Sequence, residues 1–164
     1  MIKYLVEDEW KVIEDQFHPQ YQRSSESIFS IGNGRFGQRA NFEETYSGDH
    51  LQGSYIAGVY YPDKTRVGWW KNGYPEYFAK VLNSINWIGI RVFVDELELD
   101  LNTCEVLAFR RELDMKSGML RRWFEVKLSN GKKIAVEASR FCSMSDDETA
   151  AISYRIKAVD AAHI

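Results

Sequence analysis

The clearest pattern of hydrophobic and polar positions predicts a β-hairpin in the last third of the chain. Phe124, Val126 and Leu128 alternate with Glu125 and Lys127, which is the period of a strand with one wet face. The dipeptide at positions 130–131 is Asn-Gly, which suits the left-handed backbone of a two-residue turn. Apolar residues then alternate again on the return segment, at Ile134, Val136 and Ala138.

Other segments predict further strands. A polar–apolar alternation covers 152–156, and another covers 97–101 after a turn at Asp95-Glu96. The segment 87–94 carries apolar residues on one face. Residues 54–61 are rich in aromatic and β-branched side chains and are expected to end in a turn at Pro62-Asp63. A short strand is expected at 27–31, stopped by the turn sequence of residues 32–34.

Helical signals are weak. Residues 7–17 could form a short helical turn that Pro19 ends, and residues 74–83 could hold one more turn. The count of about eight to ten strand candidates, one after another, predicts an all-β fold, an antiparallel β-sandwich with little helix.

Charge and hydropathy narrow the class of protein. The 164 residues carry a formal charge of -3, and their basic residues form only scattered pairs, which argues against a nucleic-acid partner. No apolar run approaches the ~18–20 residues that span a bilayer, and the acidic start does not resemble a signal peptide. We therefore expect a cytoplasmic protein with no membrane partner.

Motifs for metal, nucleotide or thiol chemistry have little support. His18, His50 and His163 lie far apart in the sequence, so we expect no metal site. Cys104 and Cys142 are expected to be two buried free thiols. Residues 32–37 spell G-x-G-x-x-G, but no helical pattern follows. A turn or bulge between two strands, supported by glycine, is the preferred interpretation.

Carboxylates are the next candidates for chemistry. Glycosidase chemistry needs two carboxyl groups about 5–9.5 Å apart across a sugar. Neighbours on a strand point to opposite faces, so Glu43 and Glu44 are not expected to line one site. The cluster at 146–148 precedes a strand and reads as a solvated turn.

Aromatic residues make up 14% of the chain and are densest around positions 69–78. This patch holds Trp69, Trp70 and Tyr74 and is interleaved with polar residues. It could pack onto its own sandwich, contact another domain, or stack on sugar rings.

Five ordered sequence blocks resemble glycoside hydrolase family 65, known mainly for maltose, trehalose and kojibiose phosphorylases. The blocks are ESIFSIGNGRFGQR with the Glu pair after it (26–44), GSYIAGVY (53–60), NW (86–87), RELDM with Gly118 and LR (111–121), and RFCSM (140–144). Together they run from about Trp10 to Tyr154. Phe36, Gln38 and Ala40 stand where members more often carry a leucine, a variable residue and a glycine.

The resemblance implies that residues 1–164 are an amino-terminal β-sandwich domain of the super-sandwich type, a fragment that ends before the sandwich is complete. In the family this domain precedes an (α/α)6-barrel that holds the catalytic glutamate. The parent reaction is inverting phosphorolysis of an α-glucoside to β-glucose 1-phosphate, with inorganic phosphate as co-substrate and no cofactor. No catalytic residue can be carried onto this chain, which is predicted to be inactive alone.

The resemblance also sets the expected partners. They are the barrel of the same polypeptide and a second copy of the chain, with an α-glucoside as a further ligand. The candidates for interdomain or substrate-rim contact are Arg39, Glu43, Glu44, Trp69, Trp70 and Tyr74, against internal packing as the alternative. A stand-alone carbohydrate-binding β-sandwich module is the competing function.

Overall fold

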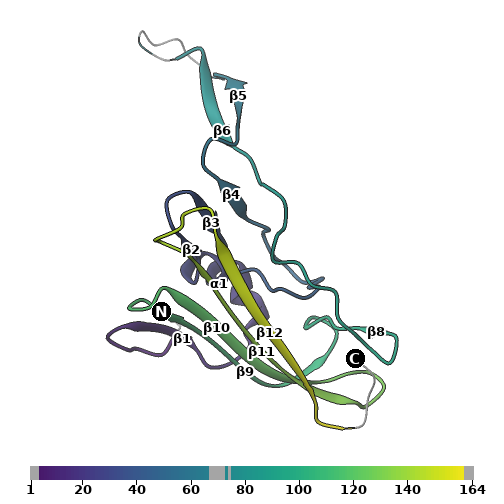
Figure 1. The fold of residues 1–164 in the computed structure, drawn as a ribbon. Coiled ribbons are helices and arrows are strands. Elements are labelled where there is room, and N and C mark those ends of the chain that lie inside the picture. The colour runs from purple at the N-terminus through teal and green to yellow at the C-terminus, as the bar shows by residue number, and fades with distance from the viewer. Residues whose placement is uncertain (1–3, 67–72, 74, 161–164) are drawn as a thin grey trace.

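The computed structural model describes residues 4–66, 73 and 75–160, and these form an all-β fold with a single α-helix among them. The strands are mostly antiparallel and fall into several sheets (Figure 1). Their bounds are β1 Lys11–Glu14, β2 Ile31–Gly32, β3 Phe36–Gln38, β4 Ser54–Ile56, β5 Tyr60–Lys64, β6 Tyr77–Val81, β7 Phe93–Val94, β8 Leu97–Glu98, β9 Glu105–Asp114, β10 Met119–Lys127, β11 Lys133–Cys142 and β12 Ala150–Ala158.

The main sheet has the order β1-β9-β10-β11-β12, with every neighbour antiparallel. It confirms the predicted hairpin, because Phe124 pairs with Val136 and Val126 with Ile134 across β10 and β11. The predicted strand at 152–156 lies inside β12. The pairing of β9 with β10 is interrupted by a bulge in β9. Glu125 pairs with Ala108 and Val126 with Val106, so Leu107 has no partner on β10 and its side chain is exposed.

The inner face of this sheet carries the core. Phe109, Phe124 and Val136 are buried there against side chains from the loops and short strands that cover the sheet. Those covering side chains are Phe42, Tyr46, Val92, Val94, Leu99 and Leu101. The expected long strand at 87–94 is therefore wrong in its backbone, since only β7 is strand, but right in its buried apolar positions.

In the amino-terminal part of the chain, the segment predicted to be helical contains a strand, and part of the segment predicted to be a strand is helical. The helix α1 spans Gln22–Ile28 after a 3-10 turn at Pro19–Tyr21, and it occupies part of the segment expected to be a strand. Conversely, the segment expected to hold a helical turn contains β1. Pro19 stands at the first position of the helical segment, where its missing N–H is no loss, so it starts a helix here and does not end one.

Residues 54–64 also differ from expectation. The chain turns at Ala57-Gly58, with Gly58 at φ +84°, and the proline expected in a turn lies inside β5. The segment expected to hold a helical turn at 74–83 instead contains β6, which pairs with β5. The two strands form an arm that projects from the rest of the fold (Figure 1).

The turn at Asn33 and Gly34 confirms the structural interpretation of the glycine motif. Strands β2 and β3 pair across it, and Gly34 has φ +87°. The Asn33 side chain accepts hydrogen bonds from the N–H groups of Arg35 and Phe36, each at 3.0 Å. Its amide donates to the carbonyl oxygens of Ser143 and Asp147, at 2.7 and 3.0 Å, and so fixes the turn to the loop before β12.

No helix among the described residues has the length and apolar character needed to cross a membrane.

Candidate functional site

Three arginines lie buried on the inner face of the main sheet. Arg111, Arg122 and Arg140 come from β9, β10 and β11, and each is at most 5% exposed. Arg111 and Arg122 are direct cross-strand partners, so like charges face each other at close range. Burying such charges is costly unless carboxylates pair with them.

Glu43 and Glu44 supply that pairing from the segment between β3 and β4. Glu43 receives hydrogen bonds from Arg140 Nη1 at 2.7 Å and from Arg122 Nη2 at 2.6 Å. Glu44 binds Arg122 through both of its carboxylate oxygens. The expectation that these two carboxylates face apart is wrong, because their segment is not a strand and both turn toward one guanidinium.

The rest of the network ties more distant elements together. The Tyr154 hydroxyl of β12 donates to Glu44 Oε2 at 3.1 Å. Arg140 Nη2 donates to the carbonyl oxygens of Arg39 and Asn41, at 3.2 and 3.0 Å. Arg111 Nη2 donates to Gln22 of α1 at 2.8 Å and lies 3.2 Å from Glu14 of β1. The network therefore joins the main sheet, the helix and the covering loop.

Protonation in the network follows from burial and from these pairs. Burial alone raises the pKa of Glu43, but the charges of Arg140 and Arg122 outweigh it, so the pKa lies below its ordinary value. Burial lowers the pKa of Arg122, yet Glu44 and Glu43 together raise it overall. Burial also lowers the pKa of Arg111, to about 10. A general acid needs a raised pKa, so the environment of Glu43 is the opposite of what that role requires.

Arg39 is a half-buried connector beside this network. Its guanidinium donates to Ser27 Oγ at 2.7 Å, to the Arg23 carbonyl at 2.9 Å and to the Leu51 carbonyl at 3.0 Å. A Cβ at Gly53 would lie only 2.1 Å from Arg39 Cδ, so the glycine makes room for this side chain. Arg39 thus joins α1 to the loop before β4.

A polar cavity of about 380 Å³ adjoins the two glutamates. Side chains with spare polar atoms line it alongside Glu43 and Glu44, among them His50, Gln52 and Asn86. Gln52 donates to Asn86 at 3.3 Å, and His50 Nδ1 contacts the Gly48 carbonyl at 2.9 Å. Such amide and imidazole groups can bind hydroxyl groups. The third carboxylate in the lining, Glu26, already accepts hydrogen bonds from Leu51 N at 2.9 Å and from Gln22 Nε2 at 3.3 Å.

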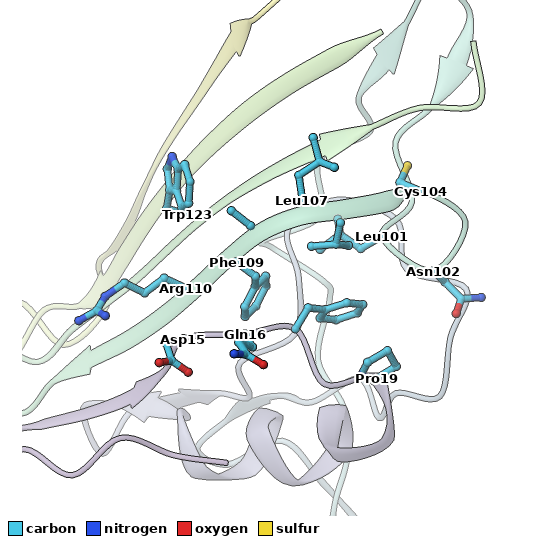
Figure 2. Close-up of a pocket in the computed structure, with 13 residues that line it drawn as sticks. Asp15, Gln16, Pro19, Leu101, Asn102, Cys104, Leu107, Phe109, Arg110 and Trp123 are labelled. Carbon is cyan, nitrogen blue, oxygen red and sulfur yellow. The ribbon is translucent and has the colours of Figure 1, made fainter. Parts of the chain in front are cut away.

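A larger cavity, of about 860 Å³, follows the part of β9 that β1 leaves uncovered (Figure 2). Figure 2 shows Asp15, Phe109 and Arg110 along one side and Trp123 on the neighbouring strand. Cys104 stands at its far end, where burial raises the pKa of the thiol above its ordinary value. A thiol in that state is a poor nucleophile.

A third cavity, of about 500 Å³, lies at the root of the β5–β6 arm. Phe36, Ile56 and Trp87 give it an apolar lining, and the rings of Phe36 and Trp87 meet edge to face with centroids 6.3 Å apart. Arg35 and Glu148 stand at its rim, joined by a hydrogen bond of 2.7 Å. No group of three or more His, Cys, Asp or Glu side chains among the described residues could hold a metal ion.

The structure brings together three of the six sequence-based site candidates. Arg39, Glu43 and Glu44 lie in or beside one network, whereas Trp69, Trp70 and Tyr74 lie outside the described residues. Sequence reasoning missed the arginines. Arg122 stands two positions before Phe124 in an apolar alternation, and that period places it on the buried face.

Comparisons with known proteins agree with this architecture. A sequence model described as "Glycosyl hydrolase family 65, N-terminal domain" matches residues 12–164. Maltose phosphorylase of Bacillus subtilis (strain 168) is 50% identical over 147 residues, which are 90% of this chain and 19% of that protein. Alpha,alpha-trehalose phosphorylase of Thermoanaerobacter brockii is 33% identical, over 93% of this chain and 20% of that protein.

The solved structures give the same result. One described as "Putative kojibiose phosphorylase from human microbiome" superposes with a TM-score of 0.81 at 39% identity. The match covers 93% of this chain and 20% of the other. The chain thus spans about a fifth of the length of the proteins that it matches.

Proposed function

Because the chain belongs to glycosyl hydrolase family 65 and corresponds to its N-terminal domain, we propose that it is the non-catalytic scaffold of a larger disaccharide phosphorylase. In this proposal the domain braces a catalytic barrel of the same polypeptide and takes part in self-association. The parent enzyme cleaves an α-glucoside with inorganic phosphate and releases β-glucose 1-phosphate. The relatives named above, a maltose and a trehalose phosphorylase, support that substrate class.

One observation carries the scaffold role: the side chains of Glu43 and Glu44 are committed to Arg122 and Arg140. Carboxylates held in this way stiffen the covering loop and are not available to protonate a leaving oxygen. A rigid loop beside a polar cavity suits a surface against which a second domain is positioned. Arg39 is placed to support that surface, since it anchors the same loop to α1.

A chimaera tests the proposal. The matched 147 residues of the Bacillus subtilis maltose phosphorylase are replaced by the corresponding residues of this chain. We expect maltose-dependent release of glucose 1-phosphate from the chimaera and none from this chain alone. Turnover by the isolated chain would refute the scaffold role, and a folded chimaera without activity would show that this domain does not fit a maltose-type barrel.

A stand-alone carbohydrate-binding module is the second candidate, and the cavity at Trp87 favours it. An aromatic side chain beside polar rim groups is the usual composition of a sugar site. Titration with malto-oligosaccharides would then change tryptophan fluorescence, and Trp87→Ala would abolish the change. An unchanged spectrum at millimolar sugar would remove this candidate and leave the scaffold role untouched.

A further inference from the structure

The β5–β6 arm leaves a strand with almost no cover. All five residues of β6 are exposed, among them Tyr77 at 51% and Val81 at 65%. In β5, Tyr60 and Tyr61 are 58% and 57% exposed. An isolated two-stranded hairpin is marginally stable in water, and exposed apolar strands of this kind are sites of association.

Two hydrogen bonds fix which backbone groups point away from the arm. Leu82 N donates to Val59 O at 3.3 Å, and Thr65 N donates to Glu76 O at 2.8 Å. In an antiparallel ladder such bonded pairs alternate with non-bonded ones. The residues of β6 whose N–H and C=O groups face outward are therefore Tyr77, Ala79 and Val81, and the corresponding residues of β5 are Tyr60, Pro62 and Lys64.

The two outer edges of the arm differ in one decisive way. Pro62 stands in the middle of the β5 edge and has no N–H to donate, which protects that edge from further pairing. The β6 edge has no proline, and its three outward N–H groups have no hydrogen-bond partner among the described residues. Only β6 can therefore extend this sheet by a regular ladder.

We propose that β6 pairs antiparallel with β6 of a second copy, about a two-fold axis at Ala79, to form a four-stranded sheet. The inference rests on the self-association within the proposed function and names the strand that carries it. A strand edge with outward N–H and C=O groups on alternate residues is complementary to itself when reversed, as a two-fold interface requires. No other partner sequence is needed to satisfy it.

The side chains agree with this register. It places Tyr77 opposite Val81 and Phe78 opposite Lys80 of the other copy, so no like charges meet. One face of the arm carries Tyr77, Ala79 and Val81 with Tyr60 and Pro62 and becomes continuous across the axis, and its one charged member is Lys64, opposite Tyr77. The other face keeps the ion pair between Asp63 and Lys80.

The outer edge of the main sheet, β12, is less suited to this pairing. Its exposed positions include Arg155 and Lys157, and charged side chains of this kind discourage pairing between edges. The β6 edge carries a single charged side chain, Lys80, which is paired with Asp63 of the same arm, and this contrast with β12 decides between the two edges.

Sedimentation velocity on the chain from about 10 to about 500 μM tests the proposal, because a small interface gives weak association. We expect the mass to rise from 19.1 kDa toward twice that value. Ala79→Pro removes an outward N–H and no hydrogen bond within the arm, so we expect at least a tenfold weaker dimer. Lys64→Pro is the matched control, since it removes an outward N–H from the β5 edge only, and we expect it to dimerise as the unmodified chain does.

Cross-linking gives a second readout. Bonded antiparallel partners have Cα atoms about 5.5 Å apart, within the range of a disulfide. Ala79→Cys should therefore give a covalent dimer under mild oxidation, whereas Lys80→Cys, opposite Phe78 on the other face, should not. The unmodified chain, with Cys104 and Cys142, sets the baseline.

Three results would each overturn the inference: a monomer at the highest concentration, a dimer unaffected by Ala79→Pro, or a dimer in which Ala79→Cys does not cross-link. If Ala79→Pro loses the native circular dichroism spectrum, the cross-linking pair decides alone. These readouts do not involve turnover, so their failure leaves the chimaera test of the scaffold role unaffected.

Discussion

The hydroxyl of Tyr154 lies 3.1 Å from Glu44 Oε2, and this contact connects the outermost strand of the main sheet to the loop that covers its inner face. Burial, and then the neighbouring Glu44 carboxylate, raises the pKa of Tyr154 above its ordinary value, so the hydroxyl remains a donor. The last strand of the sheet is thereby included in a network whose centre is two strands away, at Arg122.

Tyr154→Phe should destabilise the chain by about 1–2 kcal/mol. The substitution keeps the ring and removes a hydrogen bond to a charged acceptor that is buried. Urea denaturation followed by circular dichroism measures the change. Ser153→Ala, an exposed neighbour on the opposite face, is the control and should stay within about 0.5 kcal/mol of the unmodified chain. Equal effects of the two variants would mean that the hydroxyl contributes nothing.

Arg122→Met should be far more damaging, by roughly 3–5 kcal/mol. It removes one partner of a buried cluster and leaves the carboxylates of Glu43 and Glu44 without their shared cation. The adjacent Arg121 is exposed, and its contact with Asp114 is a loose 3.8 Å, so Arg121→Met is the matched control. Thermal unfolding should separate the two variants clearly. A small loss for Arg122→Met would show that the cluster contributes little to stability.

Acid should unfold the chain in part through Glu43. Its pKa is lower in the folded than in the unfolded state, so its contribution is complete above the unfolded pKa of about 4.3. That contribution is lost as the pH falls through the lower folded pKa. Glu43→Gln should therefore lower stability at neutral pH and flatten the decline below about pH 4.3.

The exposed Glu137→Gln should leave the acid limb unchanged. Unfolding free energies at a series of pH values provide the measurement. Parallel curves for the unmodified chain and Glu43→Gln would contradict the assignment.

Asn33→Ala should cost about 2 kcal/mol, because one side chain makes four hydrogen bonds across two loops. Asn130 occupies a similar turn but accepts only from Lys132 N among the hydrogen bonds described for it, at 3.0 Å. Asn130→Ala should accordingly be milder. Hydrogen exchange at Arg35 and Phe36 would report the loosened turn. Unchanged protection there would argue against this role for Asn33.

The carboxyl-terminal half of the fold could be predicted because its strands pair with their neighbours in sequence. The β10–β11 hairpin has a regular alternation and an Asn-Gly turn, and local signals of this kind survive tertiary packing. The region 87–101 shows the limit, since its buried apolar residues are spaced as in a strand while most of its backbone is loop. The apolar pattern of this region reflects which side chains are buried, and a loop can bury them without the backbone hydrogen bonds of a strand.

The amino-terminal half and the candidate site depended on contacts between distant residues. Strand β1 exists because it pairs with β9, which no local pattern around Lys11 indicates. The joint burial of Glu43 and Glu44 depends on arginines from two strands much later in the chain. The alternation of apolar residues in β10 could have predicted that Arg122 is buried, but it could not have predicted which carboxylates pair with it.

The pairing of β1 with β9 also has a consequence for how the chain is made. Lys11 leaves the ribosome long before its partner Asp114. At about 5–20 residues per second, that interval lasts about 5–20 seconds. The hairpin β10–β11 pairs as soon as its own two strands have been made, whereas the amino-terminal strand stays unpaired until β9 has been made. Asp8 and Glu9, just ahead of β1, would help to keep this segment in solution meanwhile.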